Sequence, residues 1–239
     1  MAKSISVTWS EGVNEQEWKI LANVIDQTLK WLYLHHPLAL MDPPLQTRIF
    51  GNWIIPILAP DRPYWGTQWY IDTSYNDELQ RVIAPTFLEL VRREPWQQQN
   101  PHFDLALLDQ DLTDFPVPLA KLRPDHYCLG TSLPGTTAVM SVHQIRTLPD
   151  EHIRELALAR LVRHHLGHVL GIPQFTRKEG TTRLGLEMHC TETCAMRHVA
   201  TVEQLAELAR EEAEMNWPFC EHCTQELLSI VVRNVYDWS

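Results

Sequence analysis

Two histidines, His164 and His168, lie four residues apart in the segment RHHLGHVLGIPQ, which spans residues 163–174. Side chains four residues apart on a helix differ by only about 40° around its axis, so both imidazoles would project from one face. Neutral imidazole nitrogens suit zinc, and a site with three protein ligands keeps one position open for water. The pair therefore predicts part of a zinc site of the kind found in catalysis, and this site needs a third ligand.

The third ligand has two candidates. In the extended zinc-protease pattern, the helix breaks at a glycine three residues after the second histidine, and a third histidine follows three residues later. Gly171 occupies the glycine position, but Gln174 stands where the third histidine belongs. If the segment 172–188 loops out, His189 can be the third ligand instead. The sequence leaves both possibilities open.

His165 follows the first ligand, at the position where the zinc-protease pattern has a glutamate. That glutamate takes a proton from the attacking water and passes it to the leaving amine, a step commonly worth a factor of about 10² to 10⁴. Histidine has the reach but not the negative charge, and the metal would repel an imidazolium. We interpret His165 as the candidate catalytic residue, with weakened proton transfer. Glu179 and Glu187 are the alternative bases.

Four of the five cysteines form two close pairs in the last third of the chain: Cys190 with Cys194, and Cys220 with Cys223. Four thiolates make a closed tetrahedral zinc site, which contributes directly to folding. The pairs therefore predict a second, structural zinc site. The fifth cysteine, Cys128, is expected to be a buried small apolar side chain.

In their order along the chain, these residues resemble the archaemetzincin family of zinc metallopeptidases. The matching positions are His164, His168, Gly171, His189-Cys190, Cys194-Ala195-Met196, Cys220 and Cys223. The resemblance covers roughly residues 103–223. It implies a metzincin-like α/β fold, with a twisted mixed sheet, an active-site helix below it and a small C-terminal subdomain held by zinc. The chain would be a divergent member, because His165 replaces the catalytic glutamate.

The surrounding pattern predicts one metzincin-like domain over residues 1–239. Its N-terminal subdomain, residues 1–171, ends with the active-site helix, and the C-terminal subdomain, residues 172–239, holds the cysteine site. Hydrophobic periodicity and caps predict the elements. Helices are expected at 14–36, 76–94, 150–171, 201–215 and 224–238, and strands at 46–50, 52–58, 67–73, 103–112, 126–132 and 136–145.

Composition limits the possible partners. The 239 residues carry a formal net charge of -10 and contain no run of Lys or Arg, which argues against nucleic acid or an anionic membrane as partner. No long apolar stretch is present, so a cytoplasmic location is expected. A peptide or protein is the expected partner.

Three functions fit the sequence. The first is a zinc-dependent metallopeptidase whose activity is reduced or lost because of His165. The second is a catalytically inactive zinc-binding relative that binds peptides or a protein partner, and the third is a purely structural protein with two zinc ions. His198 could reach the cleft as a hydrogen-bond donor or a substitute ligand, and Met196 could lie in a turn beneath the metal or simply in the core.

Overall fold

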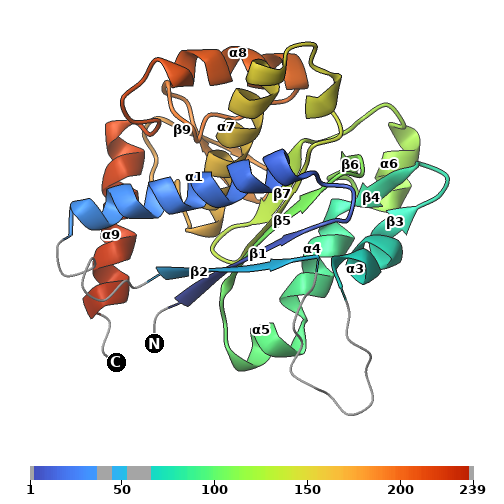
Figure 1. Ribbon diagram of the computed structural model, residues 1–239, viewed down its shortest axis with the longest axis horizontal. Helices are drawn as coiled ribbons and strands as arrows, with labels where there is room; N and C mark the ends of the chain where they lie inside the picture. The colour runs from blue at the N-terminus through green and yellow to red at the C-terminus, as the bar shows by residue number, and fades with distance from the viewer. Residues whose placement is uncertain (1–2, 37–44, 53–65, 237–239) are drawn as a thin grey trace.

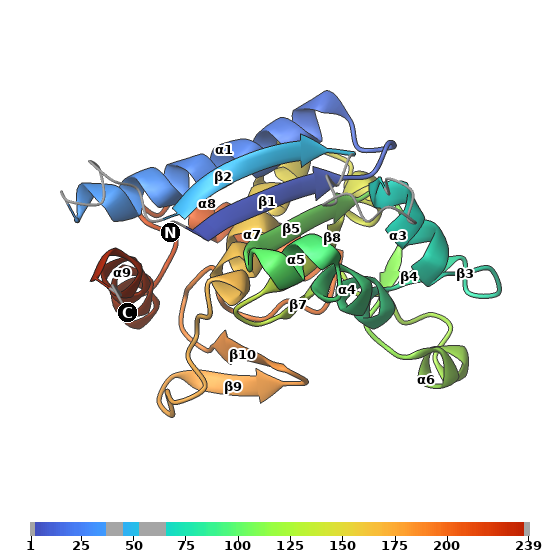
Figure 2. The ribbon, with the colours of Figure 1, turned by 90° about the horizontal axis from the view of Figure 1, so that it is seen from below.

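The computed structural model describes residues 3–36, 45–52 and 66–236 of the chain. Its centre is a five-stranded sheet with the strand order β2-β1-β5-β8-β7 (Figures 1 and 2). The edge strand β7 runs antiparallel to β8, and the other neighbouring pairs are parallel. The predicted α/β class with a mixed sheet is confirmed. The strands are β1 (Lys3–Trp9), β2 (Leu45–Gly51), β5 (Phe103–Leu108), β7 (Gly130–Leu133) and β8 (Thr137–Ser141).

Helices cover both faces of the sheet, so β5 and β8 are buried along their whole length. Leu105 and Leu107 of β5 point to one apolar core, and Ala106 and Leu108 point to the other. Helices α1 (Glu15–Leu34) and α7 (Glu151–Val169) pack on the first face, and α3 (Thr67–Ser74) and α4 (Ala84–Arg92) on the second (Figure 2). Short elements are α5 (Pro95–Gln99), α6 (Val117–Leu122) and the 3-10 turn η1 (Ile145–Thr147).

Helix α7 carries the HxxxH pair and confirms the helix predicted over 150–171. Its N-cap is Asp150, whose side chain accepts a hydrogen bond from the Ile153 N–H. It ends before Gly171, whose φ of 88° lies in the left-handed region that glycine adopts at little cost. From Ala157 onward nearly every residue is buried, because the sheet, α1 and α8 surround this half of the helix.

The chain after α7 forms a hairpin and two helices. The hairpin consists of β9 (Thr181–Leu184) and β10 (Glu187–Cys190), and it projects from the body of the molecule (Figure 2). Helix α8 (Val202–Ala213) begins at its predicted cap Thr201, and α9 (Glu221–Tyr236) begins three residues before its predicted start. No helix within the described ranges is both long and apolar enough to cross a membrane.

Two predictions in the N-terminal half are wrong. The segment 67–73 was expected to be a strand, but it is helix α3, in which residues 67, 70, 71 and 74 are buried at helical spacing. The helix expected over 76–94 begins only at Ala84. Before it lies the hairpin of β3 (Tyr75–Asn76) and β4 (Arg81–Ile83), and β4 pairs with β6 (Leu112–Thr113). The Asn76 side chain accepts a hydrogen bond from the Leu79 N–H in the intervening turn, so it caps no helix.

The sequence patterns also missed β1, a central strand in which Ser4 and Ser6 are buried along with the apolar residues. Its alternation of polar and apolar residues therefore does not correspond to an exposed and a buried face. The strand expected over 52–58 lies almost entirely outside the described residues.

A buried ion network joins α7 to α8. The Glu212 carboxylate binds both Arg160 and Arg163, and the Arg160 and Glu212 side chains are only 3% and 4% exposed. Arg160 Nη2 also donates to the Cys194 carbonyl oxygen at 3.0 Å. This network holds the end of α8 and the segment around Cys194 against the helix that carries the histidines.

We expect Glu212→Gln to lower the free energy of unfolding by about 3–5 kcal/mol, because it leaves a buried guanidinium without its counter-charge. Urea denaturation followed by tryptophan fluorescence measures this loss. Glu211→Gln, at an exposed neighbouring position, is the matched control and should change the value by less than about 0.5 kcal/mol. Equal stability of the two variants would contradict the assigned role of the network.

Candidate metal centre

Three buried histidines from two elements meet at one point. His164 and His168 come from α7, His189 comes from β10, and one nitrogen of each lies within 4.8 Å of the others. The Nε2 atoms of His164 and His168 are 3.1 Å apart, close to the spacing of about 3.4 Å between two nitrogen ligands of a tetrahedral zinc ion. We call these three residues the histidine group. Gln174 is not part of it, and its backbone N–H donates to Glu226 Oε2 instead.

The surroundings of the imidazoles fit a metal. His164 Nδ1 donates to the Ala195 carbonyl oxygen at 2.9 Å, which leaves Nε2 unprotonated and facing His168. Neither ring nitrogen of His189 has a hydrogen-bond partner among the described residues, although the side chain is 1% exposed. Buried polar atoms rarely stay unpaired. An ion held by the three nitrogens would satisfy them.

The imidazoles have the protonation state that metal binding requires. Burial, followed by the proximity of the other histidines, lowers the pKa of His164 and His168 well below the usual value. Burial also lowers the pKa of His189 to about 4. All three rings are therefore neutral at pH 7, so zinc need not displace protons from them.

His165 is turned toward the edge strand β7. Its Nδ1 lies 2.8 Å from the Ser132 hydroxyl, and a Cβ atom on Gly130 would come within 2.4 Å of its Nε2. The ring is thus wedged between α7 and β7, where only a glycine leaves room for it. Burial lowers the pKa of His165 well below the usual value. One nitrogen of this candidate catalytic residue is consequently engaged by a serine.

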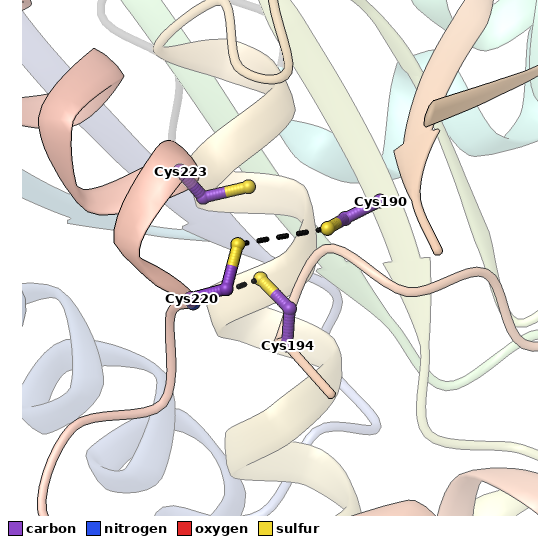
Figure 3. Close-up of side chains that lie close together, drawn as sticks. All are labelled: Cys190, Cys194, Cys220 and Cys223. Atoms are coloured by element: carbon purple, nitrogen blue, oxygen red, sulfur yellow. Dashed lines mark hydrogen bonds between the residues drawn. The ribbon is translucent and has the colours of Figure 1, made fainter. Parts of the chain in front are cut away.

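The four predicted cysteines also come together (Figure 3). The Sγ atoms of Cys190 and Cys220 are 3.6 Å apart, close to the separation of about 3.8 Å between thiolates around tetrahedral zinc. No two are joined by a disulfide, and three of the four are buried. Hydrogen bonds among the four sulfur atoms lower the pKa of Cys190 and Cys220, which favours their thiolates, and raise the pKa of Cys194 and Cys223. We call these four residues the cysteine group.

Donors surround the sulfur atoms. Cys194 Sγ accepts from the backbone N–H groups of Cys220 and Met196, at 3.3 and 3.4 Å. Arg177 donates to Cys223 Sγ from both terminal nitrogens, at 3.4 and 3.5 Å. Such donors stabilise thiolates, as a zinc site requires. Sequence patterns did not single out Arg177, because its sulfur contact depends on how the segment 172–188 folds.

The two groups share one stretch of chain. His189 and Cys190 are consecutive, and Ala195, whose carbonyl orients His164, follows Cys194. Met196 is fully buried against α7, where a Cβ on Gly167 would lie 2.3 Å from its sulfur. The fold therefore places the methionine directly against the helix that carries the HxxxH pair.

A cleft of about 360 Å³ opens onto the histidine group. Strand β7 forms one wall, and the tip of the β9–β10 hairpin contributes another. Glu187 and His198 also line it, and the rings of His198 and His189 are 4.8 Å apart. Cys128 lines it too but belongs to neither group, and burial raises the pKa of its thiol.

Comparison with known proteins supports the fold. No family model and no curated protein matches the sequence. The structure is similar to the crystal structure of archaemetzincin from Methanopyrus kandleri, with a TM-score of 0.56 and 17% identity, over 97% of this chain and 96% of that one. It is also similar to a zinc-dependent peptidase from Methanocorpusculum labreanum, with a TM-score of 0.53 and 17% identity, over 93% and 99% of the chains. At this identity the likeness shows the fold alone.

We expect protein purified without added metal to contain two zinc ions per chain, and His164→Ala/His168→Ala to contain one. Cys220→Ser/Cys223→Ser should lose both, because His189 depends on Cys190 for its position. Elemental analysis gives these values, and circular dichroism reports whether each variant is folded. Cys128→Ser should retain two ions. If the folded cysteine variant kept one ion, the two groups would be independent.

The pH dependence of zinc binding follows from the pKa values. Protons compete for an imidazole only near or below its pKa, and the pKa of His189 is about 4 rather than 6.5. We expect the affinity of the histidine group to be constant from about pH 8 to 6 and to fall only below about pH 5. Competition with a chelator, with the His164→Ala/His168→Ala signal subtracted, measures it. A decline that begins near pH 6.5 would show ordinary, solvated imidazoles.

Proposed function

We propose that this protein is a zinc-dependent metallopeptidase. The observation that carries the proposal is the histidine group itself, three buried neutral imidazoles of which two, His164 and His189, line a cleft bounded by an edge strand. Bound zinc would supply a Lewis acid and a water nucleophile at neutral pH. The similar structures from the two archaea are described as archaemetzincin and as a zinc-dependent peptidase, which supports the same chemistry.

Strand β7 suits an extended peptide substrate. It is the last strand of the sheet, and its outer edge pairs with no other strand in the described part of the chain. Such an edge can hydrogen-bond to an added extended chain. A peptide that pairs with residues 130–133 would lie beside His164 and His189, because these two members of the histidine group line the same cleft as β7. The substrate bond is thereby held near the metal position.

We assign the role of general base to Glu187. Its side chain lines the cleft, its Oε2 is 3.6 Å from His189 Nε2, and its carboxylate lies against Ser132 of β7. Burial raises the pKa of Glu187 to about 7, which matches a base that works near neutral pH. Glu187 Oε1 would take the proton of the attacking water and return it to the leaving amine.

The other candidates for the base are less well placed. Glu179 is exposed and does not line the cleft. His165 is held by Ser132 and lacks the negative charge that favours proton removal. The engagement of His165 also favours the second candidate function, a catalytically inactive relative that binds a peptide or protein in the same cleft. Activity measurements separate these two functions.

We expect Glu187→Gln to reduce peptide hydrolysis at least about 10²-fold with two zinc ions retained, because the proton acceptor is lost. His165→Ala and Glu179→Gln should both keep most of the activity. The rescue variant Glu187→Gln/His165→Glu returns a carboxylate to the helix and should regain activity. Cleavage of a mixed peptide library, followed by mass spectrometry, provides the assay.

Two results would overturn parts of this assignment. Full activity of Glu187→Gln would exclude that residue as the base. No cleavage by wild-type protein that contains two zinc ions, combined with cleavage by His165→Glu, would establish the inactive relative.

A further inference from the structure

The segment 172–188 between the two halves of the histidine group exposes large apolar side chains. Phe175 is 56% exposed, Leu184 is 43% exposed and Leu186 is 58% exposed. They are three of the seven exposed large apolar residues in the described ranges. Such side chains scattered singly need no explanation. Leu184 and Leu186 are not scattered, because they flank one glycine at the hairpin tip and both line the cleft.

Contacts within the hairpin hold the backbone of the tip. Leu184 pairs with Glu187 across the hairpin, so Gly185 and Leu186 form a two-residue turn. Gly185 has a φ of 60°, and its carbonyl accepts a hydrogen bond from Arg183 Nε at 3.1 Å. These contacts fix the backbone of the turn, from which both leucines line the cleft. Their position beside the cleft is therefore a property of the hairpin.

Other residues that line the cleft are apolar as well. They are Leu133 of β7, Leu129 just before it, Leu88 of α4, Val199 before α8 and Leu205 within α8. Together with the tip they form a pocket beside the strand edge. A large apolar side chain of a bound peptide would lose its contact with water here, which is favourable in proportion to the area buried.

The charges of the cleft oppose an acidic ligand. Arg160 is the only lysine or arginine among the described lining residues, and its guanidinium is bound by Glu212. The lining carboxylates are Glu187, Glu89, which pairs with Arg92 and Arg93, and Asp114, which lies 2.6 Å from His126. Away from the metal position, the cleft therefore offers an acidic side chain no unpaired lysine or arginine, and burial of its charge would be costly. A peptide with an apolar or neutral side chain meets no such penalty.

We propose that the tip of the β9–β10 hairpin is a specificity wall that selects extended peptides with a large apolar side chain, such as leucine, next to the residues held by β7. The inference rests on the proposed peptidase function and deepens it by naming the substrate class. Leu184 and Leu186 are the specificity-determining residues. They act on the substrate side chain and take no part in metal binding.

The test uses three fluorescein-labelled hexapeptides, Gly-Ala-Gly-X-Gly-Ala, with X as leucine, alanine or aspartate. Their anisotropy on mixing with zinc-loaded protein, before any turnover, gives each Kd. We expect the leucine peptide to bind wild type at least about tenfold more tightly than the other two. Leu184→Ser/Leu186→Ser should bring the ratio close to one with zinc content unchanged. Leu34→Ser, at a residue of α1 that is 68% exposed, is the matched control and should keep the preference.

Equal binding of the three peptides by wild type, or a preference that survives in the double serine variant, would overturn the inference. Mass spectrometry of the same peptides after long incubation reports on hydrolysis separately. A leucine preference without cleavage would support the specificity wall and refute the peptidase function. Cleavage without a preference would refute only the wall.

Discussion

One peptide bond, between His189 and Cys190, sets the geometry of the functional end of the molecule. His189 belongs to the histidine group and Cys190 to the cysteine group. When either group forms, it therefore also fixes the residue next to a member of the other group. Ala195 strengthens this connection, because it follows Cys194 in the chain and its carbonyl orients His164. If zinc binds the cysteine group, the binding energy released at the four thiolates would also help to hold the three imidazoles in place. This arrangement explains how a loop as long as 172–188 can precede a ligand without loss of precision.

The buried half of α7 depends on partners for its polar side chains, since imidazoles without hydrogen bonds are costly in an apolar interior. His164 finds a carbonyl, and His165 finds the Ser132 hydroxyl. Close approach of the neighbouring elements makes these contacts possible, and it requires glycine at two positions: Gly130 admits the His165 ring, and Gly167 admits Met196. The sheet, α7 and the segment after the hairpin can therefore pack closely because Gly130 and Gly167 have no side chain.

The sequence predicted the features that follow from local periodicity. The HxxxH pair, its helix and the glycine stop are set by 3.6 residues per turn, and the cysteine pairs are set by short spacings. His189 rather than Gln174 joins the histidine group because the β9–β10 hairpin brings the chain back to α7. No local sequence pattern specifies this arrangement. In the N-terminal half, β1 was missed because its serines are buried. The segment 67–73 was misread as a strand because the helical spacing of its buried residues spans only two turns.

Both ends of the segment 172–188 are anchored on the cysteine group. Arg177 binds Cys223 near its start, and the chain continues after its end into His189 and Cys190. The tip residues Leu184, Gly185 and Leu186 belong to neither group, so substitutions there are expected to leave both groups in place. In evolutionary terms, the hairpin separates two kinds of change. Under the proposed function, the anchors would be constrained together with the metal-ligand residues, whereas a related chain with other residues at the tip would have a different peptide preference.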